Sequence, residues 1–267
     1  MFKKEKQKFE PTLVQPGRGR TGWVSPDYAV SRRVSLDPAV LEENRCVAFF
    51  PDYPELEYFR VLRSRILKSA SNRDGRVIMV TSAHPGEGKT LTAINLAFTL
   101  AREYRQTVLL ADGDLRNQTV HHRLGLPADG GLVDYLLEER SLPELITWPG
   151  VEKLTLISGG RNIQGSSELL ESPRMREMVE EMKARYPERY VLFDVPPVLA
   201  GADAMAFSSH ADHIVFVVEA GRTPKTEITR ALALLPREKI VGLVLNRQDR
   251  QSIPGYADRY AGYGGAK

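Results

Sequence analysis

Residues 77–90 read VIMVTSAHPGEGKT, an apolar run followed by a loop of small residues that ends in Gly88-Lys89-Thr90. The residues that follow repeat apolar side chains at helical spacing, so the pattern predicts a strand, a loop and a helix in that order. Backbone N–H groups of such a loop converge on phosphate oxygens, and the positive end of the helix faces the same oxygens. We expect Lys89 to reach the outer phosphates and the Thr90 hydroxyl to bind Mg²⁺. The stretch therefore predicts a site for a nucleoside triphosphate.

The loop departs from the usual pattern at one position, because Ala83 stands where a first glycine is common. The change is small, since alanine is the next smallest residue. The loop residues expected to contact the nucleotide are Pro85, Gly86, Glu87, Gly88, Lys89, Thr90 and Leu91.

Composition places the chain among ordinary globular proteins. Of its 267 residues 42% are hydrophobic and 27% charged, and no stretch is long and apolar enough to span a bilayer. Residues 1–33 hold eight Lys or Arg and three acidic residues, so the net charge of +3 belongs to this end and the remainder sums to −2. This distribution gives no basis for a nucleic-acid-binding face. The single cysteine, Cys46, excludes an internal disulfide and fits a reducing cytosol.

The chain divides into a flexible basic leader at 1–50, a nucleotide-binding domain at 51–247 and a flexible tail at 248–267. Within the domain, continuous apolar runs alternate with helical patterns, which is typical of a doubly wound, mostly parallel α/β sheet with helices on both faces. The strands are expected at 76–81, 107–112, 153–158, 190–194, 213–219 and 240–245. The helices are expected at 55–70, 89–103, 131–140, 167–186, 200–209 and 224–235.

Three aspartates stand at strand ends. Asp112 and Asp114 follow one strand and Asp194 ends another. Because ligands of a doubly wound sheet bind at the carboxyl ends of its strands, we expect these carboxylates beside the phosphate loop. Mg²⁺ takes one or two carboxylates together with phosphate oxygens, so Asp112, Asp194 and Thr90 are its expected ligands. A strand-end aspartate can also be a turn former or a helix cap.

The loop at 85–90, the run Asp112-Gly113-Asp114-Leu115-Arg116 and the segment 194–197 together resemble the bacterial tyrosine kinases, the P-loop autokinases of capsule and exopolysaccharide systems. The similarity spans about residues 55–247, and the nearest likeness is to autokinases encoded with exosortase-linked loci. The resemblance implies ATP and Mg²⁺ as cofactors, with Lys89 and Thr90 binding them. It also implies that Asp112 and Asp114 share metal coordination and tyrosine activation, in an order that stays open, and that Asp194 serves the metal.

Three further residues are expected at the nucleotide. The Asn246 amide offers a donor and an acceptor to a purine edge, although asparagine also forms turns. Arg116 and Arg247 are expected to join it.

Three of the ten tyrosines, Tyr256, Tyr260 and Tyr263, lie in the last twelve residues. A glycine-spaced tail can present a phenol to a neighbouring subunit at high effective concentration, and phosphorylation adds about −1.5 to −2 charge at each site. We expect these tyrosines to be the phosphoacceptors; the alternative is a low-complexity tail without a role.

Glu57, Arg60 and Arg63 share one flank of the expected helix at 55–70. Their simplest role is ion pairing along the helix, but the resemblance implies a contact in a ring-shaped homo-oligomer. It also implies a membrane chain-length-determinant adaptor that recruits the cytoplasmic kinase to the inner face of the membrane, and a tyrosine phosphatase.

Two other functions compete with the kinase. A switch ATPase like the cell-division-site and plasmid-partition proteins would hydrolyse ATP without phosphorylating protein, but its signature lysine is replaced by His84. A catalytically inactive scaffold is disfavoured because Lys89, Thr90 and the three aspartates are all present. The five histidines form no metal-ligand pattern.

Overall fold

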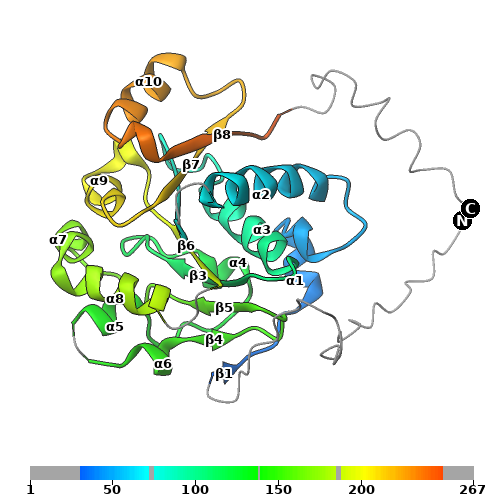
Figure 1. Cartoon of the computed structure of the whole chain (residues 1–267), viewed down its shortest axis with the longest axis vertical. Helices are drawn as coiled ribbons and strands as arrows, with labels where there is room; N and C mark the ends of the chain where they lie inside the picture. The colour runs from blue at the N-terminus through cyan, green and yellow to red at the C-terminus, as the bar shows by residue number, and fades with distance from the viewer. Residues whose placement is uncertain (1–30, 72–74, 138, 185–187, 249–267) are drawn as a thin grey trace, which may run out of the picture.

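A computed structural model describes residues 31–71, 75–137, 139–184 and 188–248. Their strands form one sheet in the order β1-β4-β5-β3-β6-β2-β7-β8, parallel throughout except where β4 meets β5 (Figure 1). The expected mostly parallel α/β sheet is confirmed, and all six expected strands occur. The strands are β1 Arg32–Arg33, β2 Val77–Ser82, β3 Thr107–Asp112, β4 Thr147–Trp148, β5 Leu154–Ile157, β6 Arg189–Asp194, β7 His213–Glu219 and β8 Ile240–Asn246.

Helices cover both faces of the sheet (Figure 1). Along β2 the side chains alternate: Ile78 and Val80 pack against α2 (Leu56–Ser71) and α3 (Lys89–Ala101), whereas Val77 and Met79 join the cluster on the opposite face. All four are fully buried, as expected of a strand covered on both faces. The opposite cluster is formed with α5 Leu132–Leu136, α6 Leu142–Leu145, α7 Ser166–Glu171, α8 Pro173–Ala184, α9 Asp203–Ser208 and α10 Lys225–Ala233.

The strand order places the phosphate loop between two acidic strand ends. β2 lies between β6 and β7, and β3 lies beyond β6, so consecutive strands leave a crevice at their carboxyl ends. In the register of β3 and β6, Asp112 stands opposite Asp194. The sheet itself therefore brings the aspartates together beside the loop.

The prediction of a flexible leader at 1–50 is wrong for residues 38–50, because this segment is part of the core. It forms α1 (Pro38–Glu43) and a 3-10 turn, η1 (Val47–Phe49), and it buries Leu41, Cys46 and Ala48 completely. The Asp37 carboxylate accepts from the Ala39 N–H at 2.8 Å and starts α1. Burial raises the pKa of the Cys46 thiol to about 12, consistent with an inert side chain.

The helix expected at 167–186 is two helices. Ser172 has an extended backbone between α7 and α8, because the ring of Pro173 disfavours a helical residue before it. The helix expected at 131–140 is the shorter α5, and the one expected at 200–209 begins only at α9, after a 3-10 turn, η2. The remaining short elements are α4 Val120–Arg123, η2 Val198–Ala200 and η3 Arg237–Lys239.

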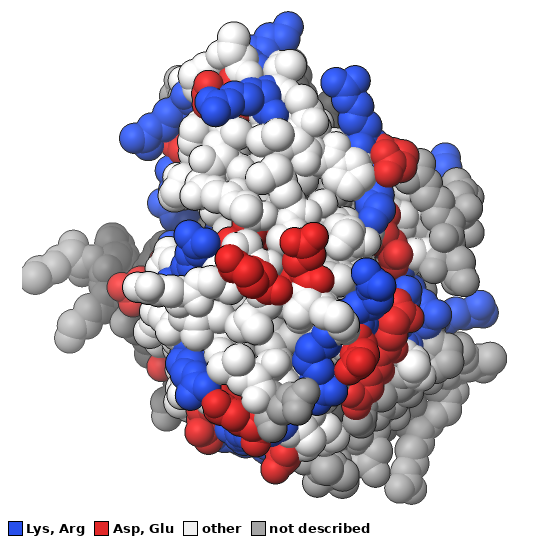
Figure 2. Space-filling model, turned by 90° about the vertical axis from the view of Figure 1, so that its left-hand side faces the viewer, with Lys and Arg blue, Asp and Glu red and all other residues white. Residues whose placement is uncertain are grey.

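The described surface carries charges of both signs. On the face shown in Figure 2, Lys and Arg side chains are scattered among acidic and uncharged ones and form no single basic patch. Among the described residues, no helix combines the length and apolar character needed to cross a bilayer.

Candidate nucleotide and phosphoryl-transfer site

The loop between β2 and α3 has the backbone that its glycines permit. Gly86 and Gly88 have φ angles of 86° and 97°, which other residues adopt only with strain. A Cβ on Gly88 would lie 2.0 Å from the Asn246 side-chain nitrogen, whereas no atom of the described residues lies within 4 Å of the same position on Gly86. Ala83 is fully buried and has no positive φ, which explains why a first glycine is not needed there.

The Glu87 side chain stabilises the loop from within. One carboxylate oxygen accepts from the backbone N–H groups of Ala83, at 2.8 Å, and His84, at 3.0 Å. The other accepts from the hydroxyl of Thr223, in the segment after β7. Glu87 is only 3% exposed, so its carboxylate contacts protein rather than the open cleft.

Lys89 lies at the centre of the acidic cluster. Its Nζ is 2.9 Å from Asp114 Oδ2 and 3.4 Å from Asp194 Oδ1. The Thr90 hydroxyl donates to Asp194 Oδ2 at 2.6 Å. Burial alone would lower the pKa of Lys89, but the charges of Asp194 and Asp114 outweigh it and raise that pKa. The lysine therefore stays charged, ready for an anionic ligand.

Asp112 is more deeply buried than Asp114. It is fully buried, and one of its oxygens accepts from the N–H groups of Thr119 and Val120, both at 3.0 Å, at the start of α4. Burial, reinforced by the charge of Asp194, raises the pKa of Asp112 to about 7. Burial also raises the pKa of Asp194, against the opposing effect of Lys89.

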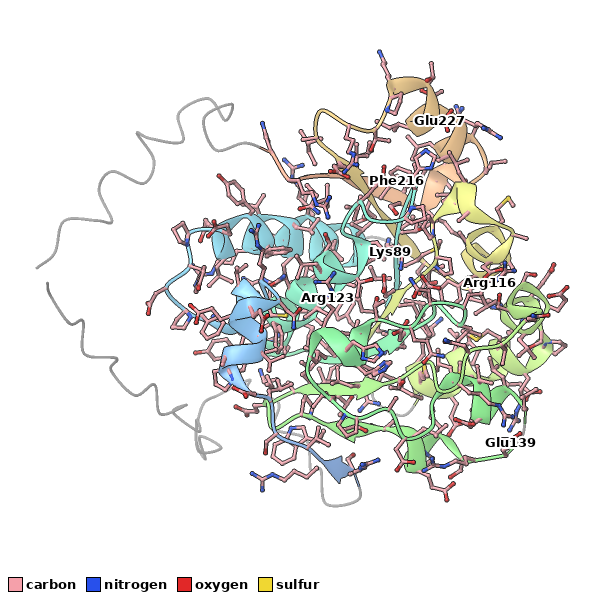
Figure 3. The ribbon with its side chains drawn as sticks, turned by 180° about the vertical axis from the view of Figure 1, so that it is seen from behind. Lys89, Arg116, Arg123, Glu139, Phe216 and Glu227 are labelled. Atoms are coloured by element: carbon pink, nitrogen blue, oxygen red, sulfur yellow. The ribbon has the colours of Figure 1, made fainter. Side chains whose placement is uncertain are left out.

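A cleft of about 900 Å³ opens above this cluster. Asp114 lines it with Lys89 and Thr90, whereas Asp112 and Asp194 lie beneath its floor. In Figure 3, Lys89 lies between Arg123, on the side of α1, and Arg116, on the side of α7. The residues 43–59 that line one wall include Glu43, Asn44, Arg45, Val47, Glu55 and Phe59. No pattern in the sequence predicts this wall, because its residues reach the cleft only through packing on α3.

The other expected nucleotide residues also line the cleft, but each has a protein partner. Arg116 contacts both carboxylate oxygens of Asp203, each at 3.1 Å. The Asn246 amide donates to the Glu87 carbonyl at 2.8 Å, and Arg247 donates to Glu219 at 2.9 Å. The side-chain NH₂ group of Asn246 therefore binds the backbone of the phosphate loop.

The oligomer residues expected on α2 differ in their surroundings. Glu57 and Arg60 form an exposed ion pair at 2.9 Å. Arg63 turns inward, donates to the Thr99 carbonyl at 3.1 Å and pairs with Glu103 at 2.8 Å, so it joins α2 to α3. Tyr256, Tyr260 and Tyr263 lie outside the described residues. Within the described part, no three His, Cys, Asp or Glu side chains form a metal-binding group.

Comparison with known proteins places this chain in a family. Residues 75–232 match the family described as AAA domain. Tyrosine-protein kinase YwqD of Bacillus subtilis is 35% identical over 204 residues, which cover 75% of this chain and 85% of that protein. Succinoglycan biosynthesis transport protein ExoP of Rhizobium meliloti is 34% identical over 220 residues, 80% of this chain but only 28% of ExoP.

The chain is also similar to proteins of known structure. The chimerical protein CapA2B2 has a TM-score of 0.70 and 28% identity, with 84% of this chain and 95% of that chain covered. The septum site-determining protein MinD from Pyrococcus horikoshii, complexed with Mg-ADP, has a TM-score of 0.53 and 24% identity, covering 68% and 76% of the two chains. The likeness to MinD concerns the fold alone. The shared fold therefore does not distinguish a kinase from a switch ATPase.

Proposed function

The chain belongs to the bacterial tyrosine-kinase family, and from this premise we propose that it is an ATP-dependent autokinase that phosphorylates the tail tyrosines of a neighbouring copy. The observation that carries the proposal is the Lys89 ammonium, 2.9 Å from Asp114 and 3.4 Å from Asp194, at the floor of a 900 Å³ cleft. A nucleotide phosphate beside Lys89 would have both a cation and carboxylates within reach, which phosphoryl transfer requires.

The donor set suits Mg²⁺. The Thr90 hydroxyl and Asp194 are hard oxygen ligands already 2.6 Å apart, and Asp112 lies across from Asp194 in the sheet. Thr90, Asp194 and Asp112 would hold the ion directly or through water. A Mg²⁺ ion held by these residues would neutralise charge on the nucleotide phosphates.

Asp114 is the better placed of the two open candidates for tyrosine activation. It lines the cleft and contacts Lys89, whereas Asp112 uses its oxygens for backbone N–H groups. In the transfer, the tyrosine oxygen forms a bond to the γ-phosphorus and the bond from that phosphorus to the β–γ bridging oxygen breaks. The phenolic proton passes to Asp114, and ADP leaves.

The names of the relatives support a role for this chain in exopolysaccharide biosynthesis. The chain spans 28% of ExoP, whose name places it in succinoglycan biosynthesis and transport. We propose that this chain regulates exopolysaccharide polymerisation or export as a cytoplasmic homo-oligomer. A membrane adaptor of the chain-length-determinant class would recruit it to the membrane, and a tyrosine phosphatase would reset it. Of the three residues expected at the oligomer contact, Glu57, Arg60 and Arg63, we propose the exposed pair of Glu57 and Arg60 as the part that contacts a neighbouring subunit. A Glu57→Ala/Arg60→Ala variant should lower the assembly mass in light scattering.

The central experiment incubates the purified full chain with Mg-ATP and maps phosphorylation by mass spectrometry. Phosphate on Tyr256, Tyr260 or Tyr263 is expected in the wild type and in the control Lys183→Met, but not in Lys89→Met. Release of ADP without protein phosphorylation would instead identify a switch ATPase. If the isolated chain shows no phosphorylation, the same assay is repeated with the membrane adaptor. The absence of phosphorylation with the adaptor present would refute the proposed kinase activity.

Mixing two full chains tests transfer between copies. One chain carries Lys89→Met and keeps its tail, and the other keeps Lys89 but has all three tail tyrosines changed to phenylalanine. Phosphate on the Lys89→Met tail requires transfer between molecules. Its absence, with robust phosphorylation of the wild type alone, would mean that each chain phosphorylates itself.

A further inference from the structure

The cleft extends well beyond its phosphate loop. Lys89 lies between Arg123 and Arg116 in Figure 3, and Asn246 contacts the phosphate loop at the Glu87 carbonyl. A further end is formed by the N-terminal wall, with Arg45, and by α4, with Arg123. Arg45 and Arg123 line the cleft but are not among the residues expected to bind the nucleotide.

Two of the four arginines that line the cleft are neutralised by carboxylates. Arg116 pairs with the buried Asp203, and Arg247 pairs with Glu219. Arg45 and Arg123 differ: both are exposed, and within the described residues neither guanidinium forms an ion pair or a hydrogen bond. Two uncompensated cations therefore stand at one end of the cleft.

The backbone fixes both arginines in place. Arg45 has a φ of 58°, an uncommon conformation for a non-glycine residue, and its carbonyl accepts from the Asn95 amide at 3.2 Å. Asn95 also accepts from the Ala48 N–H at 2.8 Å, so the Arg45 loop is fastened to α3, the helix that follows the phosphate loop. A strained conformation held by such contacts is common at functional sites.

Arg123 ends α4, whose first N–H groups are bound by Asp112. The Cys46 sulfur lies 4.0 Å from the Arg123 carbonyl oxygen, so the two arginine-bearing segments touch. Both arginines are thus held on backbones tied to the reaction site, which reduces the entropic cost of binding an anion.

On this basis we propose that Arg45 and Arg123 form a subsite for the acceptor peptide, and that they bind the Asp258 carboxylate. The proposal deepens the kinase function and rests on it. Asp258 is two residues from Tyr256 and two from Tyr260. In an extended peptide, residues two apart lie on the same side at a spacing of about 7 Å. The Asp258 carboxylate lies on the C-terminal side of Tyr256 and on the N-terminal side of Tyr260, so the peptide would run in opposite directions when each tyrosine is the acceptor.

Charge complementarity supports this occupant. The cleft lining also includes the carboxylates of Glu43 and Glu55, so an occupant that carried negative charge alone would meet repulsion. The dipeptide Asp258-Arg259 offers one charge of each sign between the two tyrosines.

The test uses the two-chain mixture. The enzyme chain carries Arg45→Glu and Arg123→Glu, and the acceptor chain carries Lys89→Met. We expect the initial phosphorylation rate at Tyr256 and Tyr260 to fall about tenfold, because like charges then face each other. ATP affinity, measured with a fluorescent nucleotide, should be unchanged. Arg105→Glu, an exposed arginine beyond the far end of α3, is the matched control.

Charge exchange makes the test specific. An acceptor carrying Asp258→Lys should restore most of the rate with the Arg→Glu enzyme and lose rate with the wild-type enzyme. Tyr263, five residues from Asp258, should respond less. If the double variant does not fold, Arg45→Gln/Arg123→Gln makes the same test with a smaller loss, about threefold.

Three results would overturn the subsite: a rate equal to that of the Arg105→Glu control, no rescue by Asp258→Lys, or a parallel loss of ATP affinity, which would assign the arginines to the nucleotide. These differ from failure of the kinase function. In that case the wild-type enzyme leaves the acceptor tail unphosphorylated.

Discussion

Gly88→Ala tests how tightly the phosphate loop is fitted to the last strand. The new Cβ would lie 2.0 Å from the Asn246 side-chain nitrogen, so that amide must move and lose its 2.8 Å hydrogen bond to the Glu87 carbonyl. The positive φ of 97° costs about 1 kcal/mol for a residue with a Cβ. The lost hydrogen bond adds about 1 kcal/mol, giving a total of about 2 kcal/mol.

Gly86→Ala is the matched control, because its φ is 86° but, in the part of the chain that the structure describes, no atom lies within 4 Å of the added Cβ. It should cost only the backbone term, about 1 kcal/mol. The free energy of unfolding of the full chain in urea measures both. In an Asn246→Ala background the clash is gone, so the cost of Gly88→Ala should fall to that of Gly86→Ala. Equal costs for the two glycines in the wild type, or additive costs of Gly88→Ala and Asn246→Ala, would show that the Asn246 side chain does not restrict Gly88.

Three further changes test other contacts. Burial raises the pKa of Asp112 from 3.8 to about 7, so between these two pH values the folded protein keeps a proton that the unfolded chain has lost. The stability of the folded protein should therefore fall as the pH rises through this range. In the absence of nucleotide, Asp112→Asn should flatten this part of the curve of melting temperature against pH. Glu87→Ala removes the acceptor of two loop N–H groups, and ATP affinity should fall about tenfold in a fluorescence titration; unchanged affinity would contradict this role. Leu41→Ala should cost about 2–4 kcal/mol in urea, and the exposed Leu234→Ala much less, if residues 38–50 belong to the core.

The sheet was predictable because its signals are local. Continuous apolar runs indicate buried parallel strands. Each apolar run is followed within a few residues by a turn-forming residue or an aspartate that marks the end of the strand. The same reasoning places Asp112, Asp114 and Asp194 at one edge. The break before Pro173 was also readable from the sequence, since the residue before a proline disfavours a helix.

The contacts that shape the site were not predictable, because they join residues far apart in the chain. Glu87 meets Thr223 across 136 positions, and Asn246 meets Glu87 across 159. The packing of Leu41 and Ala48 likewise depends on a partner helix rather than on their own spacing. Periodicity reports which face of an element is apolar and not which element covers it.

Transfer between copies depends on the assembly, because the length of the tail does not enforce it. Tyr256 is ten residues beyond Asn246, which touches the phosphate loop, and ten extended residues reach about 35 Å. A tail of that reach can enter the cleft of its own chain. Arg63 is held within the fold, so the exposed pair of Glu57 and Arg60 is the part of the α2 flank free to change partners. Exposed pairs are worth only tenths of a kcal/mol, so a neighbouring subunit could displace this one at little cost. The Glu57–Arg60 pair would then decide whether a chain phosphorylates its own tail or the tail of a neighbouring subunit. The two-chain mixture measures phosphorylation between chains directly.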